Sequence, residues 1–371
     1  MHIENSSAGR CIALIALAIA PVVAQSTPPP SWPVKQDDAL LRDFKFASGA
    51  LFSELKIHYR TLGSPQRDAR GRVTNAVMLL HGTSGSGAQF LSPLFSNELF
   101  APGQPLDIAK MYVIMPDGIG HGGSSKPSDG LHARFPRYGY ADMVEAQRRM
   151  LIEGLGVDHL RLLLGTSMGC MHTYVWAEAH PEFLDAAMAL ACLPAQISGR
   201  NLAWRMTVID AIRGDPAWLS GDYTAQPPSL RTALAIIAFF GGNPLTWQKA
   251  GPDRGKALAN FHSAVERRLR TADANDILYA VDASHDYDPA PGLAEIRTPI
   301  THINFADDAV NPPELHIAEE LLKRAPTVRF ELYPYGPDTA GHGSHTKAAL
   351  WKDRLLMLLR ETEARGADSR T

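Results

Sequence analysis

The side chain best suited to nucleophilic chemistry is Ser167, at the centre of a Gly-x-Ser-x-Gly motif over residues 165–169. An apolar run typical of a buried strand, residues 162–164, precedes the motif, and a helical pattern, residues 171–177, follows it. A sharp strand-to-helix turn requires neighbours without side chains, which the two glycines supply. The motif alone also fits a tight turn that contains a serine by chance. In this setting it predicts an exposed nucleophile, with the N–H of Met168 free to bind developing negative charge.

A serine nucleophile needs a base to take its proton and a buried carboxylate to orient that base. His342 lies between two glycines after the last predicted strand, where its ring can swing over the serine. We prefer it as the base to His345, which we expect to cap the final helix or to face solvent. The adjacent Asp307 and Asp308 follow another predicted strand, residues 298–305, and cannot both point the same way. The pattern predicts a Ser-His-Asp triad and leaves the acid open between these two.

Other chemistries fit these residues poorly. A metal site is not indicated, because His342 and His345 lack a third ligand and the chain has no His-Glu-x-x-His motif. The Gly-rich loop at 81–87 lacks the Gly-Lys-Ser/Thr of a phosphate-binding loop and the Gly-x-Gly-x-x-Gly spacing that opens a dinucleotide-binding helix. We therefore expect neither a metal nor a cofactor. Because glycines let backbone amides approach a ligand, we predict that this loop provides Thr83 N–H as a second oxyanion-hole donor besides Met168.

Strand and helix patterns alternate around these residues. Buried-strand patterns occupy residues 76–80, 111–115, 162–164, 186–193, 298–305 and 328–333, and two further strands surround Gly49 within 44–59. A helical pattern covers 140–155. Because Gly-rich turns follow several strands, the alternation predicts a doubly wound, mostly parallel sheet that binds its ligand beyond the strand ends. The rhythm is lost over about 194–291, where helical patterns at 201–213 and 230–240 predict a lid inserted over the serine.

Composition bounds the class of protein. The chain has 371 residues, of which 45% are hydrophobic and 20% charged, so it can bury one large core. We predict a single domain over residues 25–371, with the lid as an insertion. The net charge of -3 gives no basic surface for nucleic acid or for an anionic membrane. A small molecule is the partner we expect, and a homodimer is one assembly compatible with the sequence.

The first residues have the pattern of an export signal. Arg10 precedes an apolar run over 11–20, which is shorter than the roughly 20 residues that a spanning helix needs. Small residues before position 25 predict cleavage after Ala24, so that residues 1–24 form a signal peptide. A short membrane anchor is the alternative. We expect a periplasmic or secreted protein without stable membrane insertion after cleavage.

Cleavage would leave two cysteines, Cys170 and Cys192. A bridge between them is compatible with an exported protein, but a domain of this size does not need one. The sequence does not decide between a bridge and two free thiols, and we favour small buried thiols.

Several short motifs together resemble those of a known family. They are Ile-His-Tyr-Arg-Thr-Leu-Gly at 57–63, the serine motif, Asp-Pro-Ala-Trp at 215–218 with Gly-Asp-Tyr at 221–223, Asp308 four residues before Pro312-Pro313, and Gly341-His342. Over most of the mature chain, this combination resembles the homoserine O-acetyltransferase family of α/β-hydrolases and its esterase relatives. The resemblance implies an α/β-hydrolase fold with a helical lid and transfer through an acyl-serine.

The same resemblance implies roles for individual residues. It makes Ser167, Asp308 and His342 the triad, and it leaves Asp307 as a supporting neighbour or an N-cap. Acid and base follow the serine in this fold. We therefore interpret Asp117 and His121, which precede it, as loop-structuring residues near the pocket.

The chain departs from the acyltransferase pattern at two places. Cys170 stands where the acyltransferases usually carry a further glycine. They also carry a lid arginine that resembles a carboxylate clamp for homoserine, whereas residues 230–240 offer only Arg231, several residues early. We retain Arg205 and Tyr223, both in the predicted lid, as candidate substrate-binding residues.

These features favour an exported serine hydrolase that cleaves a carboxylic ester through an acyl-serine. Acyl-CoA is not expected outside the cytoplasm, so water is the expected acceptor. An acyl-CoA-dependent O-acyltransferase is the alternative, and a non-catalytic ligand binder on the same fold is a third hypothesis.

Overall fold

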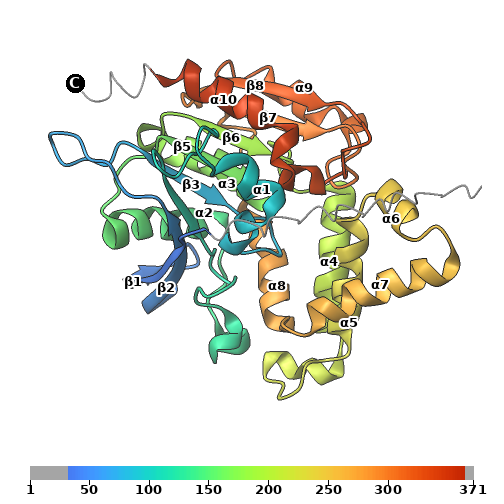
Figure 1. The fold of residues 1–371 in the computed structure, drawn as a ribbon. Coiled ribbons are helices and arrows are strands. Elements are labelled where there is room, and N and C mark those ends of the chain that lie inside the picture. The colour runs from blue at the N-terminus through green and yellow to red at the C-terminus, as the bar shows by residue number, and fades with distance from the viewer. Residues whose placement is uncertain (1–31, 364–371) are drawn as a thin grey trace, which may run out of the picture. The chain divides into compact units, whose positions relative to one another are not determined.

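An eight-stranded sheet runs through the part of the chain that our computed structural model describes, residues 32–363 (Figure 1). The predicted signal peptide lies outside these residues. The strand order is β1-β2-β4-β3-β5-β6-β7-β8. Antiparallel pairs join β1 to β2 and β2 to β4, and all other neighbours are parallel. The strands are β1 (Lys35–Lys45), β2 (Leu51–Leu62), β3 (Ala76–Leu80), β4 (Tyr112–Pro116), β5 (Leu162–Thr166), β6 (Ala187–Leu190), β7 (Ile300–Phe305) and β8 (Val328–Tyr333).

The central strands are buried on both faces. Every residue of β3, β4, β5, β6 and β7 is buried, which is why these segments read as continuous apolar runs rather than as alternating patterns. In register, Leu80 and Ala189 pair with Gly165, so the carboxyl ends of β3, β5 and β6 meet at one edge. This edge is where the sequence places the ligand, and the predicted mostly parallel sheet is confirmed.

The two strands expected around Gly49 are also present, but β1 is longer than the sequence indicates. It begins at Lys35, whereas the predicted strand region begins at residue 44. The first four residues of β1 are exposed and polar, so the period of two that marks a strand is absent there. Its pairing with β2 maintains the extended conformation over this stretch.

Helices cover both faces of the sheet. On one face, α2 (Tyr140–Arg149) and α3 (Met168–Ala179) contribute Met143 and Trp176 to a large buried cluster. On the other, α1 (Pro93–Leu99) and α10 (Lys352–Glu361) contribute Phe95 and Leu355 to a second cluster. Of the helix predicted over 140–155, the α-helical part ends at Arg149, and a π-helical segment follows over Met150–Gly154.

The short α9 (Ile317–Leu322) precedes β8. Within residues 32–363, no helix is both long and apolar enough to span a bilayer.

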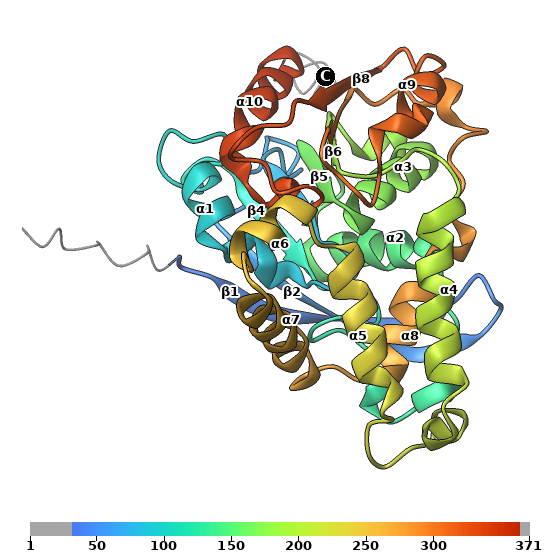
Figure 2. The same cartoon turned by 90° about the vertical axis from the view of Figure 1, so that its right-hand side faces the viewer.

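Five α-helices lie between β6 and β7, in the region where the sequence no longer alternates between strand and helix patterns (Figure 2). They are α4 (Gly199–Arg213), α5 (Ser229–Phe240), α6 (Pro244–Ala250), α7 (Arg254–Leu269) and α8 (Ala274–Asp282). The helices α4, α5, α7 and α8 share a hydrophobic cluster of their own, which includes Val208, Leu230, Leu234, Val265 and Leu278. We call these five helices the helical insertion. Its separate core explains why α5 is so apolar in sequence.

A disulfide joins Cys170, in the first turn of α3, to Cys192, just after β6. The two Cα atoms are 5.8 Å apart and both residues are buried. The expectation of two free thiols is therefore wrong. The turn at Ser167 brings the start of α3 beside the end of β6, and this proximity depends on strand pairing that spacing in the sequence does not reveal.

We expect the double substitution Cys170→Ala and Cys192→Ala to lower the free energy of unfolding by about 3 kcal/mol. The bridge closes a loop between cysteines 22 residues apart, and a loop of this length sets how much conformational entropy the unfolded chain loses. Denaturant unfolding of the oxidised protein and of the variant measures this difference. As a control, a thiol reductant should destabilise the wild type and leave the variant unchanged. Equal midpoints for wild type and variant would contradict the prediction.

Candidate active site

Ser167 lies on the sharp turn that the sequence predicts between β5 and α3. Its φ of 54° and ψ of -110° are values that residues with side chains rarely adopt. A Cβ atom at Gly165 would overlap the carbonyl oxygen of Gly169, and one at Gly169 would overlap that of Leu80. The two glycines are thus required by backbone contacts on both sides of the serine.

The structure brings together the three residues predicted as the triad. The Ser167 Oγ lies 2.8 Å from His342 Nε2, and His342 Nδ1 lies 2.8 Å from Asp308 Oδ2. The aspartate follows β7 and the histidine follows β8, so each side chain comes from a loop at the edge where Ser167 lies. A carboxylate can only accept, so the histidine donates through Nδ1 and its Nε2 is left to accept the serine proton.

Asp308 is buried and held ionised. Burial alone would raise the pKa of its carboxyl group, but the charge of His342 and the hydrogen bonds from His342, Asn311 and Val310 outweigh burial and lower that pKa. The side chain of Asn311 also donates to the Ala191 carbonyl at 3.1 Å and to Asp308 Oδ2 at 3.0 Å. Asn311 therefore fixes the acid in place. Our sequence analysis did not identify it, although an Asn three residues after an acid is a turn signal.

Asp307 points elsewhere and organises the loop that carries the base. Its Oδ2 accepts hydrogen bonds from Gly341 N at 2.9 Å, Thr339 Oγ1 at 2.9 Å and Asn243 Nδ2 at 3.0 Å. The two adjacent aspartates thus have different roles. Asp308 contacts the His342 ring, and Asp307 binds the backbone N–H of Gly341, the residue before it. Asn243 precedes α6, so this contact also ties the histidine loop to the helical insertion.

His345 differs from the expectation of a capping or solvent-facing residue. It is only 8% exposed, and its ring packs edge-on against the ring of His342 with centroids 5.2 Å apart. Burial, followed by the charge of His342, lowers the pKa of His345 to about 3, so its ring is neutral. The 3-10 turn at Gly343–Thr346 carries the side chain inward. Our prediction for this residue was wrong because that turn is not visible in the local sequence.

The Gly-rich loop after β3 lies against the serine. A Cβ atom at Gly82 would be 3.3 Å from Ser167 Cβ. His81 Nε2 accepts from Gly118 N at 2.9 Å, so its Nδ1 donates to the Gly82 carbonyl at 2.8 Å. Burial, followed by the charge of His121, lowers the pKa of His81 to about 3. His121 Nε2 lies 2.7 Å from the Thr83 carbonyl. Two buried rings therefore fix consecutive carbonyl groups of this loop.

Both predicted oxyanion-hole donors border this region. Met168 directly follows Ser167 in the chain, and Thr83 directly follows Gly82, which lies against the serine. Within residues 32–363, neither N–H donates a hydrogen bond to a protein acceptor. They are therefore able to donate to a ligand, and their role in the oxyanion hole stays a prediction.

Asp117 has the structural role that we assigned to it. Its side chain is fully buried and accepts hydrogen bonds from Arg60 Nη1, Gly87 N and Gly123 N, at 2.7, 2.7 and 2.8 Å. These contacts join the loops after β3 and β4. With His121, Asp117 shapes the loops beside the serine.

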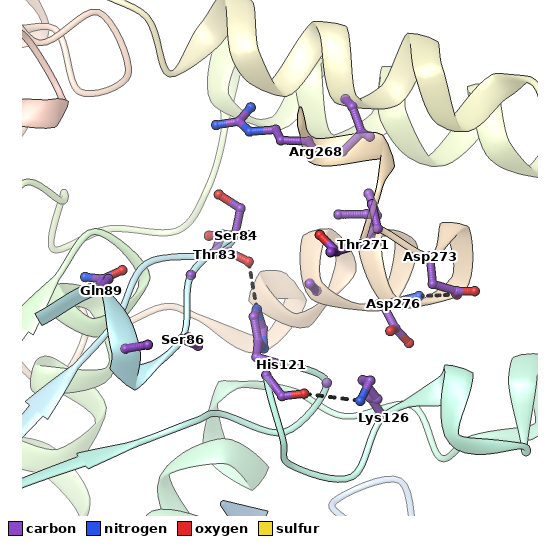
Figure 3. A pocket seen from close by; sticks show the side chains of 18 residues that line it. Thr83, Ser84, Ser86, Gln89, His121, Lys126, Arg268, Thr271, Asp273 and Asp276 are labelled. Carbon is purple, nitrogen blue, oxygen red and sulfur yellow. Dashed lines mark hydrogen bonds between the residues drawn. The ribbon is translucent and has the colours of Figure 1, made fainter. Parts of the chain in front are cut away.

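A cavity of about 670 Å³ opens beside the Gly-rich loop (Figure 3). One wall comes from the loops after β3 and β4, and the other from α5, α7, α8 and the residues between the last two helices. The lining includes Thr83, Gln89, His121, Lys126, Arg268 and Asp276. Gln89 Nε2 also donates to Thr166 Oγ1 at 3.0 Å, which ties the cavity wall to the residue before Ser167.

Arg205, on α4, and Tyr223, between α4 and α5, hold the helices of the insertion together. Arg205 is buried and donates to Asn201 Oδ1, to the Val281 carbonyl and to Ser284 Oγ. The hydroxyl of Tyr223 donates to Asp273 at 2.7 Å. Neither is among the described residues that line the cavity. A role for them in binding substrate stays a prediction.

On α5, the side chains divide between the cavity and the surface. Arg231, the arginine noted in the sequence, is exposed and forms an ion pair with Glu266 of α7. The residue of α5 that lines the cavity is Leu234. The helix on which the family resemblance expects a carboxylate clamp therefore turns an apolar side chain toward the cavity.

Comparisons with known proteins agree with this geometry. Residues 75–321 match the family model of the alpha/beta hydrolase fold. A probable acyltransferase from Methanothermobacter thermautotrophicus is 27% identical, over 78% of this chain and 89% of its own. A homoserine O-acetyltransferase from Geotalea daltonii is 28% identical, over 73% of this chain and 82% of its own.

Solved structures share the fold. An acetylester hydrolase from Corynebacterium glutamicum has a TM-score of 0.76 at 20% identity, covering 88% of this chain and 96% of its own. A homoserine O-acetyltransferase from Bacillus anthracis has a TM-score of 0.76 at 19% identity, covering 88% and 97%. The chain therefore belongs to the alpha/beta hydrolase fold family, and within it is similar to homoserine O-acetyltransferases and to an acetylester hydrolase.

Proposed function

We propose that this protein is a serine-dependent hydrolase of a small carboxylic ester and that it works outside the cytoplasm. The observation that carries the proposal is the continuous hydrogen-bond chain from Ser167 Oγ through His342 to Asp308. A non-catalytic binder would have no need of a serine, a base and a buried acid in hydrogen-bond contact. The names of the relatives include both acetyltransferase and acetylester hydrolase, and both chemistries pass through an acyl-enzyme.

The geometry suggests the following steps. Ser167 Oγ attacks the ester carbonyl while its proton passes to His342 Nε2, and the N–H groups of Met168 and Thr83 bind the oxyanion. The histidine then gives that proton to the departing alkoxide, so that an alcohol leaves and an acyl-serine remains. Water attacks the acyl-serine, loses a proton to His342, and releases the carboxylic acid together with the regenerated serine. Asp308 stabilises the imidazolium in both halves.

Two considerations favour water over homoserine as the acceptor. First, α5 presents Leu234 to the cavity, so the acceptor site is not built in the way that the resemblance to the acetyltransferases implies. Second, the predicted export signal would remove the enzyme from acyl-CoA. The acyltransferase alternative is favoured by the sequence relatives, among which homoserine O-acetyltransferases recur.

The test uses the chain from residue 25 onward with 4-nitrophenyl acetate and with acetyl-CoA, each with and without homoserine. We expect nitrophenol release that is independent of homoserine and no thiol release from acetyl-CoA. Thiol release that requires homoserine would establish the acyltransferase instead. Inertness of Ser167 toward an activated phosphonate would favour the non-catalytic binder.

A further inference from the structure

The disulfide between Cys170 and Cys192 joins two segments that also position the triad. Cys170 lies in the first turn of α3, three residues after the nucleophile, and Cys192 is the second residue after β6. We propose that the bridge is a positioning element of the triad, so that kcat depends on it as well as the stability of the fold. The inference rests on the proposed function and assigns to it a further positioning group.

Residues 190–192, which we call the β6 turn, hold the nucleophile. The N–H of Ser167 donates to the Leu190 carbonyl at 2.8 Å, and the N–H of Ala191 donates to the Ile303 carbonyl at 2.9 Å. Ala191 has a φ of 65°, in the left-handed region that residues with a Cβ atom rarely adopt. Such a conformation is maintained only where the surrounding structure enforces it. The β6 turn therefore depends on its contacts for its shape.

The β6 turn also holds the acid. The Ala191 carbonyl accepts a hydrogen bond from Asn311 Nδ2 at 3.1 Å, and the same nitrogen donates to Asp308 Oδ2 at 3.0 Å. This carboxylate oxygen in turn accepts from His342 Nδ1 at 2.8 Å. One amide group thus connects the backbone of the β6 turn to the oxygen that orients the base. A shift of the Ala191 carbonyl would reach Asp308 through a single side chain.

Two kinds of contact maintain the β6 turn. Toward β7, the Cys192 N–H donates to Asn304 Oδ1 at 3.2 Å, and the Cys192 carbonyl accepts from Asn304 Nδ2 at 3.0 Å. Toward α3, the disulfide ties the turn to the helix that begins directly after Ser167. The hydrogen bonds therefore align the turn with the strand that precedes the acid, and the bridge aligns it with the nucleophile.

A polar relay provides a second and weaker link between α3 and the β6 turn. The Tyr174 hydroxyl donates to His302 Nδ1 at 2.6 Å, and His302 Nε2 donates to the Cys192 carbonyl at 3.1 Å. Burial lowers the pKa of His302 to about 4, so the ring is neutral and has one accepting and one donating nitrogen. Tyr174 lies one helical turn after Cys170, farther from Ser167. Because hydrogen bonds can lengthen, the disulfide is the link that fixes the spacing nearest the nucleophile.

Loss of the bridge should misplace the catalytic groups without closing the cavity. With the link to α3 gone, the φ of Ala191 can relax, and its carbonyl can turn away from Asn311. A misplacement of about 1 Å in a catalytic group can cost on the order of 100-fold in rate. The cavity keeps its walls, because the cysteines and the β6 turn are not among the described residues that line it. A bridge of this kind persists in oxidising compartments, which is compatible with the proposed location outside the cytoplasm.

The test compares the oxidised wild type with the double variant Cys170→Ala and Cys192→Ala, with 4-nitrophenyl acetate as substrate and both proteins folded. We expect kcat to fall by about 10- to 100-fold, with KM within about twofold of the wild-type value. Reduction of the wild type by dithiothreitol, which is oxidised to its cyclic disulfide as two cysteine thiols form, should lower kcat similarly once the reagent has been removed without oxygen. Reoxidation should restore it. Wild-type kcat in the folded double variant would overturn the inference.

Two further variants separate positioning from stability and from packing. Leu41→Ala removes a buried side chain from β1, which four strands separate from β6, and should destabilise the fold while kcat stays at the wild-type value. Cys170→Val with Cys192→Ala returns side-chain volume to the site of the bridge and should show the same loss of kcat as the alanine pair. It also carries the comparison if the alanine pair does not fold. Wild-type kcat in this valine variant, or an equal loss of kcat in Leu41→Ala, would refute a positioning role for the bridge.

A spectroscopic measurement separates the inference from the proposed function. The Nδ1 proton of His342 reports the alignment of base and acid without turnover, because a proton in a short hydrogen bond to a carboxylate resonates at low field. We expect this resonance in the wild type and in Leu41→Ala, and its loss or shift in the bridge variants. Its absence from Asp308→Asn would assign it. If the wild type hydrolyses no ester and the resonance still depends on the bridge, the proposed function alone fails. If loss of the bridge leaves the resonance unchanged, the positioning role is refuted.

Discussion

Replacement of Ser167 by alanine is expected to lower kcat for ester hydrolysis by about 10⁴- to 10⁶-fold, the range seen when residues of such a triad are removed. The serine hydroxyl donates to His342 Nε2, so its loss removes the attacking atom and leaves the base without its proton donor. Alanine keeps the Cβ atom and the backbone of the turn. Nitrophenol release from 4-nitrophenyl acetate, measured beside the unfolding midpoint, tests the prediction. Turnover close to the wild-type rate would exclude Ser167 as the nucleophile.

A glycine at the same position provides a control for folding. The φ of 54° at Ser167 is unfavourable for any residue with a Cβ atom, and such strain costs on the order of 1–3 kcal/mol. We therefore expect Ser167→Gly to be as inactive as Ser167→Ala but more stable toward denaturant. This result would show that the protein maintains a strained turn for the sake of the exposed hydroxyl. A glycine variant no more stable than the alanine variant would show that the turn stores no strain.

The parts of the fold and site that could be predicted are those with strong local constraints. Glycines at 165 and 169 are needed because backbone carbonyls lie where their side chains would be, and this requirement is visible as a motif. The central strands were identifiable because burial on both faces leaves continuous apolar runs. The order of serine, acid and base along the chain follows from the sheet, so Ser167, His342 and the pair of aspartates that contains the acid could be named from the sequence.

The parts that could not be predicted depend on contacts between distant segments. Asn311 supports Asp308 only because the loop after β7 reaches the Ala191 carbonyl at the end of β6. The position of Arg268 depends on how α7 packs against the rest of the insertion, and the pairing of Cys170 with Cys192 depends on the order of the strands. Local patterns contain none of this information. The assignment of Asp308 itself required the family resemblance, because sequence spacing does not separate two adjacent aspartates.

That assignment leads to the second large effect. Replacement of Asp308 by asparagine is expected to lower kcat by about 10⁴-fold, whereas Asp307→Asn should leave kcat near the wild-type value. In the wild type, His342 Nδ1 donates to Asp308 Oδ2 at 2.8 Å, which keeps Nε2 free to accept the serine proton. An amide nitrogen at position 308 would donate to Nδ1 instead. The ring would then carry its proton on Nε2, where it cannot act as a base.

Asp307 serves as the matched control because it adjoins Asp308 and accepts three hydrogen bonds. Asparagine keeps one accepting oxygen there, so Asp307→Asn should lose at most one or two of these bonds, or about 1 kcal/mol of stability for each. Steady-state kinetics with 4-nitrophenyl acetate, together with denaturant unfolding of both variants, separate the two effects. The reverse ranking of kcat would move the catalytic acid to Asp307. Equal and small losses of kcat in both variants would mean that neither aspartate controls the tautomer of His342. The hydrogen-bond chain that supports the proposed function would then consist of Ser167 and His342 without a catalytic acid.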